Sequence, residues 1–192
     1  MYLDLLKESS LYPILLHLDQ ELARQARKGG CLVCNNRLHQ ANYPRKPRGG
    51  PMADDPQYCL RLSFCCAAEG CRRRHTPASV LFLGRKVFFA AVVVLVSCLH
   101  QGPSPVRLAR LEELTGASAR TVRRWLKWWR TEFVESAFWT AHRGLSACPV
   151  DLAALPQSLL SSFLGGAHDQ LVALLRFLGP LTSRSASKNL GF

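Results

Sequence analysis

Residues 111–126 read LEELTGASARTVRRWL, and this stretch decides how the second half of the chain folds. Gly116 can adopt the positive backbone angle that a tight turn requires, and Ser118 can cap a helix that starts after it. Apolar residues then recur every three or four positions: Val122, Trp125, Leu126 and Trp129. This spacing predicts two helices joined by a tight turn, with the second helix buried along one face.

The other face of the second helix is basic. Its outward positions are Ala119, Arg120, Arg123, Arg124 and Lys127. Apolar residues that hold a helix against its domain, opposite a cationic face free to enter the major groove of DNA, are typical of a recognition helix. An ordinary helical hairpin in an all-α core is the alternative interpretation. Of the nearby tryptophans, Trp128 alone is left for an interface.

This stretch resembles the helix-turn-helix of homeodomain-like transposase and recombinase DNA-binding domains, whose consensus reads like LAxxxGVSxxTVxRWL. The matching positions are Leu111, Gly116, Ala117, Ser118, Thr121, Val122 and Trp125, whereas Glu112 replaces a small alanine. The resemblance implies double-stranded DNA as the partner. The residues expected to contact it here are Ser118, Ala119, Arg120, Thr121, Arg123, Arg124 and Lys127.

Eight cysteines are present, and six of them fall between Cys31 and Cys71. The first ten residues lack the basic start and apolar run of a signal peptide, so we expect a reducing compartment and metal ligands rather than disulfides. Two short-spaced pairs suit a tetrahedral zinc ion: Cys31 with Cys34, and Cys66 with Cys71. Cys65 is the alternative to Cys66, and Cys59, His39 and His75 are further substitutes. Cys98 and Cys148 are expected to be core thiols.

A zinc site closed by four protein ligands has no open position for substrate, so it indicates a structural metal. Basic residues outnumber acidic residues around this site, in a chain whose formal net charge is +12. Two basic groups are expected to contact phosphates: Arg72, Arg73 and Arg74 after the last ligand, and Arg45, Lys46 and Arg48 on a loop rich in proline and glycine. Residues 65–88 are similar to zinc ribbons that precede helix-turn-helix units in transposase-related bacterial proteins.

The expected fold is mainly α, with a small β zinc ribbon near the N-terminus, then a homeodomain-like helix-turn-helix and a C-terminal helical segment. Helices are predicted over residues 9–28, 84–101, 105–115, 118–133, 151–164 and 167–178, and two strands around a turn at 67–70. The expected domains are an N-terminal amphipathic helix (1–30), the zinc ribbon with its basic loop at 40–57 (31–83), the helix-turn-helix domain (84–140), the C-terminal helical segment (141–181) and a disordered tail (182–192).

Membrane insertion and catalysis are not expected. The longest apolar run, residues 87–99, is shorter than the about 20 residues that span a bilayer. The acidic residues after the ribbon lie in helical contexts, and the sequence has no glycine-rich phosphate loop, no HExxH motif and no nucleophile elbow. We therefore expect a protein that is not an enzyme.

The expected function is sequence-specific binding of double-stranded DNA, stabilised by Zn²⁺. By resemblance, its setting is a mobile element, as a transposition or recombination accessory factor or a transcriptional regulator in the bacterial cytoplasm, associated with the nucleoid. The alternatives are a non-catalytic zinc adaptor that binds RNA or a nucleoprotein complex, and an enzyme fragment without its catalytic partner. The leucine-rich C-terminal helices are expected to pack on the core and to bind a second copy or a transposase or recombinase subunit.

Overall fold

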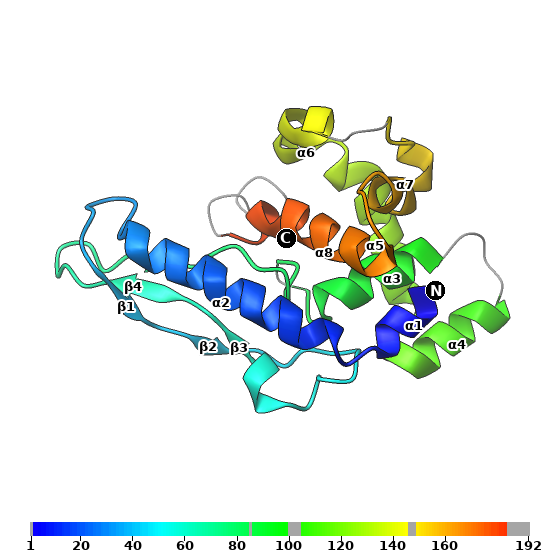
Figure 1. Ribbon diagram of the computed structural model, residues 1–192, viewed down its shortest axis with the longest axis horizontal. Coiled ribbons are helices and arrows are strands. Elements are labelled where there is room, and N and C mark those ends of the chain that lie inside the picture. Colours follow the sequence, from blue (N-terminus) through cyan, green and yellow to red (C-terminus); the bar gives the residue numbers. More distant parts are fainter. Residues whose placement is uncertain (1, 85, 100–104, 146–148, 184–192) are drawn as a thin grey trace.

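A computed structural model describes residues 2–84, 86–99, 105–145 and 149–183. The chain is mostly helical with small antiparallel sheets, as expected (Figure 1). The helices are α1 (Tyr2–Lys7), α2 (Leu11–Gly29), α3 (Ala90–Leu99), α4 (Pro105–Thr115), α5 (Ala119–Trp128), α6 (Ala137–His142), α7 (Gln157–Ser161) and α8 (Ala167–Leu178). The strands are β1 (Leu38–Gln40), β2 (Tyr43–Pro44), β3 (Leu60–Arg61), β4 (Phe64–Cys66) and β5 (Arg74–His75). Cys148 and residues 184–192, for which the sequence made predictions, lie outside the described residues.

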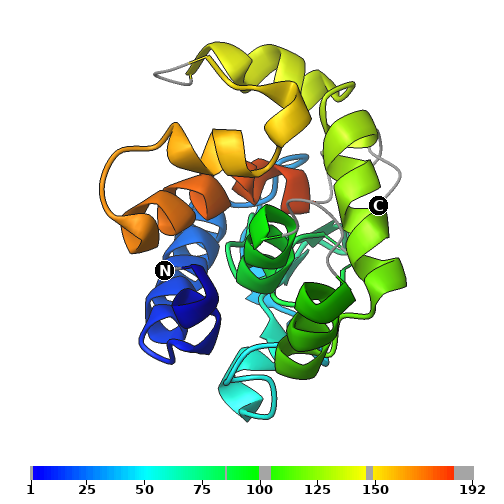
Figure 2. The ribbon, with the colours of Figure 1, turned by 90° about the vertical axis from the view of Figure 1, so that its right-hand side faces the viewer.

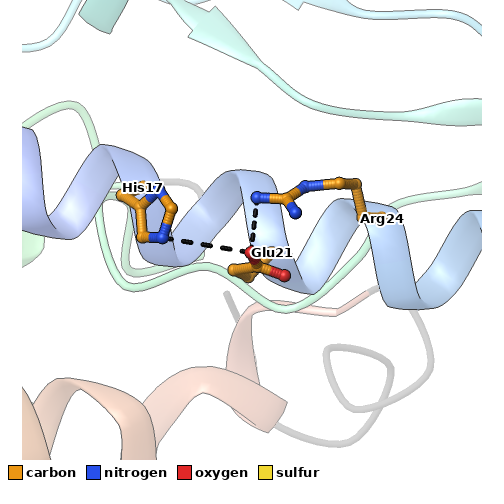
Figure 3. Close-up of polar contacts among 3 residues, drawn as sticks. All are labelled: His17, Glu21 and Arg24. Carbon is orange, nitrogen blue, oxygen red and sulfur yellow. Dashed lines mark ion pairs between the residues drawn. The ribbon is translucent and has the colours of Figure 1, made fainter.

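α2 is the amphipathic helix predicted near the N-terminus, although it begins at Leu11 rather than at Ser9. Its buried residues are Leu11, Tyr12, Leu15, Asp19 and Ala23. On the exposed face, Glu21 forms ion pairs with Arg24 at 2.5 Å and with His17 at 3.9 Å (Figure 3). Exposed pairs of this kind add little stability, so the buried stripe holds the helix in place. The sequence did not predict the short helix α1.

A long hairpin, interrupted once, occupies the segment between the two cysteine pairs. β1 pairs with β4, with Leu38 opposite Cys66, and β2 pairs with β3. One register runs through both ladders, because the Ala41 N–H donates to the Ser63 carbonyl between them at 2.8 Å. β5 joins the other side of β4, in the order β1-β4-β5. The two strands expected around the turn at 67–70 are therefore β4 and β5.

α3 is the central helix of the molecule. Residues 90–98 are all buried, and Figure 2 shows α3 between α2 on one side and α5 on the other. The predicted helix began at residue 84, but Gly84 has a φ of +60° and the Phe89 N–H donates to the Arg48 carbonyl. A backbone N–H bound in this way to the loop between β2 and β3 is not available for a helical hydrogen bond, and the helix starts at Ala90. Cys98 is buried, as expected of a core thiol.

No helix in the described ranges combines the length and the apolar character that crossing a membrane requires.

α4 and α5 are joined by the short turn that the sequence predicts. Gly116 has a φ of +67°, and the Ser118 hydroxyl accepts the N–H of Thr121 at 3.4 Å, which caps α5. The residues of α5 that are buried are Val122, Trp125, Leu126 and Trp128. Trp129, directly after α5, is also buried. The four residues predicted to face the core are therefore all buried, namely Val122, Trp125, Leu126 and Trp129.

Trp128 contradicts the prediction that it is free for an interface. Its side chain is only 3% exposed. The ammonium nitrogen of Lys86 lies 4.8 Å from the Trp128 ring centroid, and the rings of Trp129 and Phe133 pack at 4.8 Å and 5.5 Å. Other segments therefore cover a position that the helical spacing leaves on the outside.

The C-terminal helices pack on the rest of the chain. α8 matches the predicted helix over 167–178, while the predicted helix over 151–164 is a short 3-10 turn, Leu152–Ala154, followed by α7. Their buried leucines are Leu155, Leu159, Leu160, Leu171, Leu174, Leu175 and Leu178. The expected packing is confirmed, and self-association stays a prediction. Thr182, which the sequence assigned to the tail, is buried and accepts the Ser79 N–H at 2.7 Å.

Two hydrophobic cores stabilise the fold. The larger one draws on residues from Leu5 to Leu181, so the N-terminal helices, α3, the α4–α5 pair and the C-terminal helices share it. The smaller one lies under the sheet and is formed by Ala23, Cys31, Leu38, Phe64 and Cys66. Two of its five residues are cysteines, which leaves the sheet with few apolar contacts of its own.

Replacing Gly50 with alanine should destabilise the larger core. Gly50 has a φ of +86°, and a Cβ there would lie 2.1 Å from the Tyr12 hydroxyl oxygen. Tyr12 is fully buried against Tyr58 and Phe89, so it cannot move aside. We expect a loss of about 1–3 kcal/mol in the free energy of unfolding, measured with denaturant. Gly70→Ala, with no atom within 4 Å of the new Cβ, is the control, and an equal loss in both variants would contradict this account.

Candidate metal centre and basic surfaces

Four cysteine side chains meet at one end of the molecule. The Sγ atoms of Cys31, Cys34, Cys66 and Cys71 all lie within 4.8 Å of one another, with Cys34 to Cys66 at 3.4 Å and Cys31 to Cys71 at 3.7 Å. Four thiolates about 2.3 Å from one tetrahedral ion would lie about 3.8 Å apart. The cluster therefore has the size of a single-ion site, and it consists of the four ligands that the sequence predicts.

The first cysteine pair lies on a loop that closes on itself. Gly30 turns the chain away from α2 with a φ of +71°, and a Cβ there would approach the Asn35 carbonyl to 3.1 Å. The Cys31 N–H donates to the Asn36 carbonyl at 2.9 Å, and the Asn35 N–H donates to the Cys31 carbonyl at 2.8 Å. These bonds fix both sulfurs of the pair at the end of α2.

The second cysteine pair lies on a similar turn. The Cys71 N–H donates to the Ala68 carbonyl at 3.0 Å, and the Cys66 N–H, at the end of β4, donates to the Arg73 carbonyl at 2.9 Å. Arg72 follows Cys71 with a φ of +44°, just as Asn35 follows Cys34 with a φ of +54°. The two loops thus have the same turn after their second cysteine, and they present their sulfurs to a common point.

The register of β4 decides between the neighbours Cys65 and Cys66. Successive residues of a strand point to opposite faces. Cys66 is 1% exposed and lies in the smaller core with Cys31, whereas Cys65 is paired with His39 and its thiol donates to the Arg72 carbonyl at 3.2 Å. Cys65 therefore lies outside the cluster.

His75 is the predicted substitute that does reach the cluster. Its Nε2 atom lies 3.2 Å from the Cys31 sulfur. Because four thiolates already satisfy a tetrahedral ion, this imidazole is placed to donate an N–H to the Cys31 thiolate from outside the ligand set. Cys59 instead donates to the Ala53 carbonyl at 3.5 Å, and His39 is exposed on β1.

The thiols of Cys31 and Cys66 differ in how readily they ionise. Burial opposes the charge on Cys31, but the backbone amides of Val33 and Cys34 hold the pKa of its thiol at about 6. Burial raises the pKa of Cys66 to about 12, and its hydrogen bonds with neighbouring cysteines act in the same direction. One thiolate thus forms readily and makes the next unfavourable. A bound metal cation would remove this conflict and release protons.

The outer face of α5 carries the predicted DNA-contacting side chains. Arg120, Arg123, Arg124 and Lys127 are exposed, and Ser118, Ala119 and Thr121 are half-buried at the start of the helix. Within the described ranges, none of these four basic side chains forms an ion pair. Arg130 is also exposed and continues the basic spacing. Arg130 is not among the contacts predicted from the sequence, although its place three residues after Lys127 was a signal for it.

The basic residues of the loop and the sheet divide into two groups. Arg45 donates to the carbonyls of Gly84 and Lys86 at 3.3 Å and 2.6 Å, and Arg74 donates to the Ala41 carbonyl at 2.9 Å. These two guanidinium groups bind the chain's own backbone. The other four predicted phosphate contacts are exposed, as Arg74 also is, and they are Lys46, Arg48, Arg72 and Arg73.

The chain was compared with protein families, curated proteins and solved structures, and no match was found.

Proposed function

We propose that this protein binds double-stranded DNA in a sequence-specific manner and that zinc stabilises its fold. The observation that carries this proposal is the outer face of α5, where Arg120, Arg123, Arg124 and Lys127 are exposed and to which the helix contributes no acidic residue. Such a face attracts the phosphates of a duplex. The opposite face of α5 is anchored in the larger core, which gives the basic face a fixed orientation.

The arrangement of α4 and α5 supports a helix-turn-helix as the reading unit. In such a unit the first residues of the second helix contact base edges in the major groove. Arg120 lies in the first turn of α5 and Arg123 follows on the same basic face. Both can form the bidentate hydrogen bonds by which arginine recognises guanine, while Arg124 and Lys127 suit phosphates.

Zinc is the ion we propose for the cysteine cluster. Four thiolate donors at tetrahedral spacing suit zinc, and the two turns with the three-stranded sheet would then form a zinc ribbon. Because all four positions come from the protein, the ion would stabilise the fold and leave no position for a substrate. This supports a binding role rather than catalysis. The resemblance of residues 31–129 supports a mobile-element setting, as an accessory factor or a regulator.

Changing Arg120 or Arg123 to alanine should reduce the preference for the specific site over random DNA by about tenfold, because one bidentate contact with guanine contributes about 1–3 kcal/mol of discrimination. The site is first obtained by selection from a pool of random duplexes. Competitive binding to the selected site and to random DNA, at two salt concentrations, then measures the preference.

Arg176→Ala is the matched control, because Arg176 is an exposed arginine near the end of α8. It should leave the preference unchanged. If the α5 variants weaken binding to both duplexes equally, α5 contributes charge and does not read bases. If the unaltered protein selects no motif at all, sequence-specific binding is wrong and a non-catalytic adaptor for RNA or a nucleoprotein complex takes its place.

A further inference from the structure

The first cysteine loop exposes two apolar side chains at its tip. Leu32 is 81% exposed and Val33 is 58% exposed, although both are large hydrophobic residues. They lie between Cys31 and Cys34, and the hydrogen bonds of Cys31 with Asn35 and Asn36 close the loop beneath them. The closed loop therefore leaves both apolar side chains at the surface.

Exposed cations surround this tip. Arg27 and Lys28 end α2 just before the loop, Arg37 follows it, and Arg72 and Arg73 lie on the second cysteine loop. The loops lie side by side, since the Ala67 N–H donates to the Arg37 carbonyl at 3.0 Å and the four sulfurs converge between them. Glu69 is the only acidic residue among the described residues of the two loops. The tip is therefore an apolar point within a strongly basic surface.

Arg72 adds a further exposed cation to this surface. Its φ of +44° lies in the left-handed region, where a non-glycine residue costs about 1–2 kcal/mol. Glycine would relieve this strain, yet an exposed arginine occupies the position. Asn35 has a similar angle after Cys34, so the turn sets this conformation, and the arginine adds its positive charge at that point.

These observations lead us to infer that Leu32 and Val33 enter the minor groove of double-stranded DNA while the surrounding arginines bind its phosphates. The inference rests on the proposed DNA binding and adds a contact to that of α5. A duplex offers what the surface requires, namely anionic phosphates on both sides of a groove and, between adjacent base pairs, apolar stacked faces that an inserted side chain can contact. Apolar wedges between base steps bend DNA by about 20–90°.

This contact is separate from the recognition helix. Both cysteine loops lie at the end of the molecule away from α4, beyond the end of α2, whereas α5 lies beside α3 (Figure 1). The wedge can thus be altered without touching the residues that read bases. The two contacts also differ chemically, because a wedge responds to the flexibility of a base step and an arginine responds to the edge of a guanine.

The test uses the double variant L32S/V33S of the full chain on a duplex of about 30 base pairs, a length over which bending is easily measured. Fluorescence energy transfer between the duplex ends reports the bend, and titration reports the affinity. We expect the unaltered protein to bring the ends closer together. The double variant should leave the duplex straight and bind about tenfold more weakly, while keeping the salt dependence and the sequence preference that α5 provides. Arg73→Ala should instead lower the salt dependence by about one phosphate contact.

Three further measurements complete the design. Leu164→Ser removes an apolar side chain that is 88% exposed elsewhere, and it should leave the bend unchanged. Leu32→Phe should retain the bend, because a larger apolar wedge still fits between base steps. Metal analysis of each variant should give the same metal content as the unaltered protein, since neither Leu32 nor Val33 is a ligand.

The outcomes are distinct. DNA binding that depends on α5 but occurs without bending, or a bend that survives in L32S/V33S, would overturn the wedge and leave the proposed function intact. Loss of the bend in Leu164→Ser as well would also overturn it, since the effect would then be general. No DNA binding by the unaltered protein would instead mean that the proposed function itself fails.

Discussion

Removal of the metal ion proposed for the cysteine cluster should unfold the two cysteine loops and the sheet β1-β4-β5. This sheet lies on a core of five buried residues, two of which, Cys31 and Cys66, belong to the cysteine cluster. Too few apolar contacts remain to hold the strands together once the thiols lose their common cation. Metal binding to such sites contributes on the order of 10 kcal/mol in comparable peptides. We expect one zinc ion per chain and, after chelation, loss of hydrogen-exchange protection across the two cysteine loops and the strands.

Cys66→Ser and Cys65→Ser form a matched pair for this prediction. The two residues are neighbours on β4, but only the Cys66 sulfur lies in the cluster. Cys66→Ser should lose the ion and the folded sheet, whereas Cys65→Ser should keep both. The reverse result would exchange their roles. If elemental analysis finds no metal in freshly purified protein and chelators change nothing, the metal centre is wrong.

A second large loss of stability is expected when the buried carboxylate of Asp19 is removed. Asp19 is 3% exposed, and it accepts hydrogen bonds from the Ser79 hydroxyl at 2.5 Å, from the Val80 N–H at 2.6 Å and from the Leu81 N–H at 3.4 Å. Burial raises the pKa of Asp19, while these bonds and the charge of Arg61 act against the rise. Asp19 thus connects α2 with the segment that leads into α3.

Asp19→Ala should lower the free energy of unfolding by about 3 kcal/mol or more, because it leaves several buried donors without an acceptor, at about 1–3 kcal/mol each. The buried Arg61 would also lose its electrostatic partner. Denaturant unfolding measures the loss. Asp19→Asn should lose less, because the amide oxygen can still accept the backbone N–H groups.

Asp151→Ala is the control for Asp19. Asp151 also accepts a backbone N–H, that of Ala153 at 2.9 Å, but it is exposed. Its removal should cost only about 1 kcal/mol, as for an ordinary helix cap. Equal losses at the two aspartates would show that burial of Asp19 does not matter.

The cysteine spacing predicted most of the candidate metal centre. Short-spaced pairs place two sulfurs on one turn, which is a local property of the chain. The choice of Cys66 over Cys65 does not follow from spacing, because it depends on which face of β4 lies against the smaller core. The approach of His75 to Cys31 depends in the same way on the pairing of β5 with β4.

The basic residues show a similar division. The outward face of α5 follows from helical spacing, and Arg120 and Arg123 are exposed as predicted. Arg45 and Arg74 belong to clusters that look alike in sequence, yet their guanidinium groups bind backbone carbonyls of distant segments. The sequence shows which residues are charged, but it does not show which groups their side chains contact in the folded protein.

The features that depend on residues a few positions apart could be predicted from the sequence alone. These are the mainly helical fold, the turn at Gly116, the buried stripes of α2 and α5, and the two cysteine pairs. Which segments pack over each helix or strand is seen only in the tertiary structure. Trp128 is buried because Lys86 and Phe133 lie against it, and residues 86–89 are not helical because Arg48 binds the backbone of Val87 and Phe89. Periodicity reports which face of an element is apolar, whereas burial depends on segments that are distant in the chain and meet only when it folds.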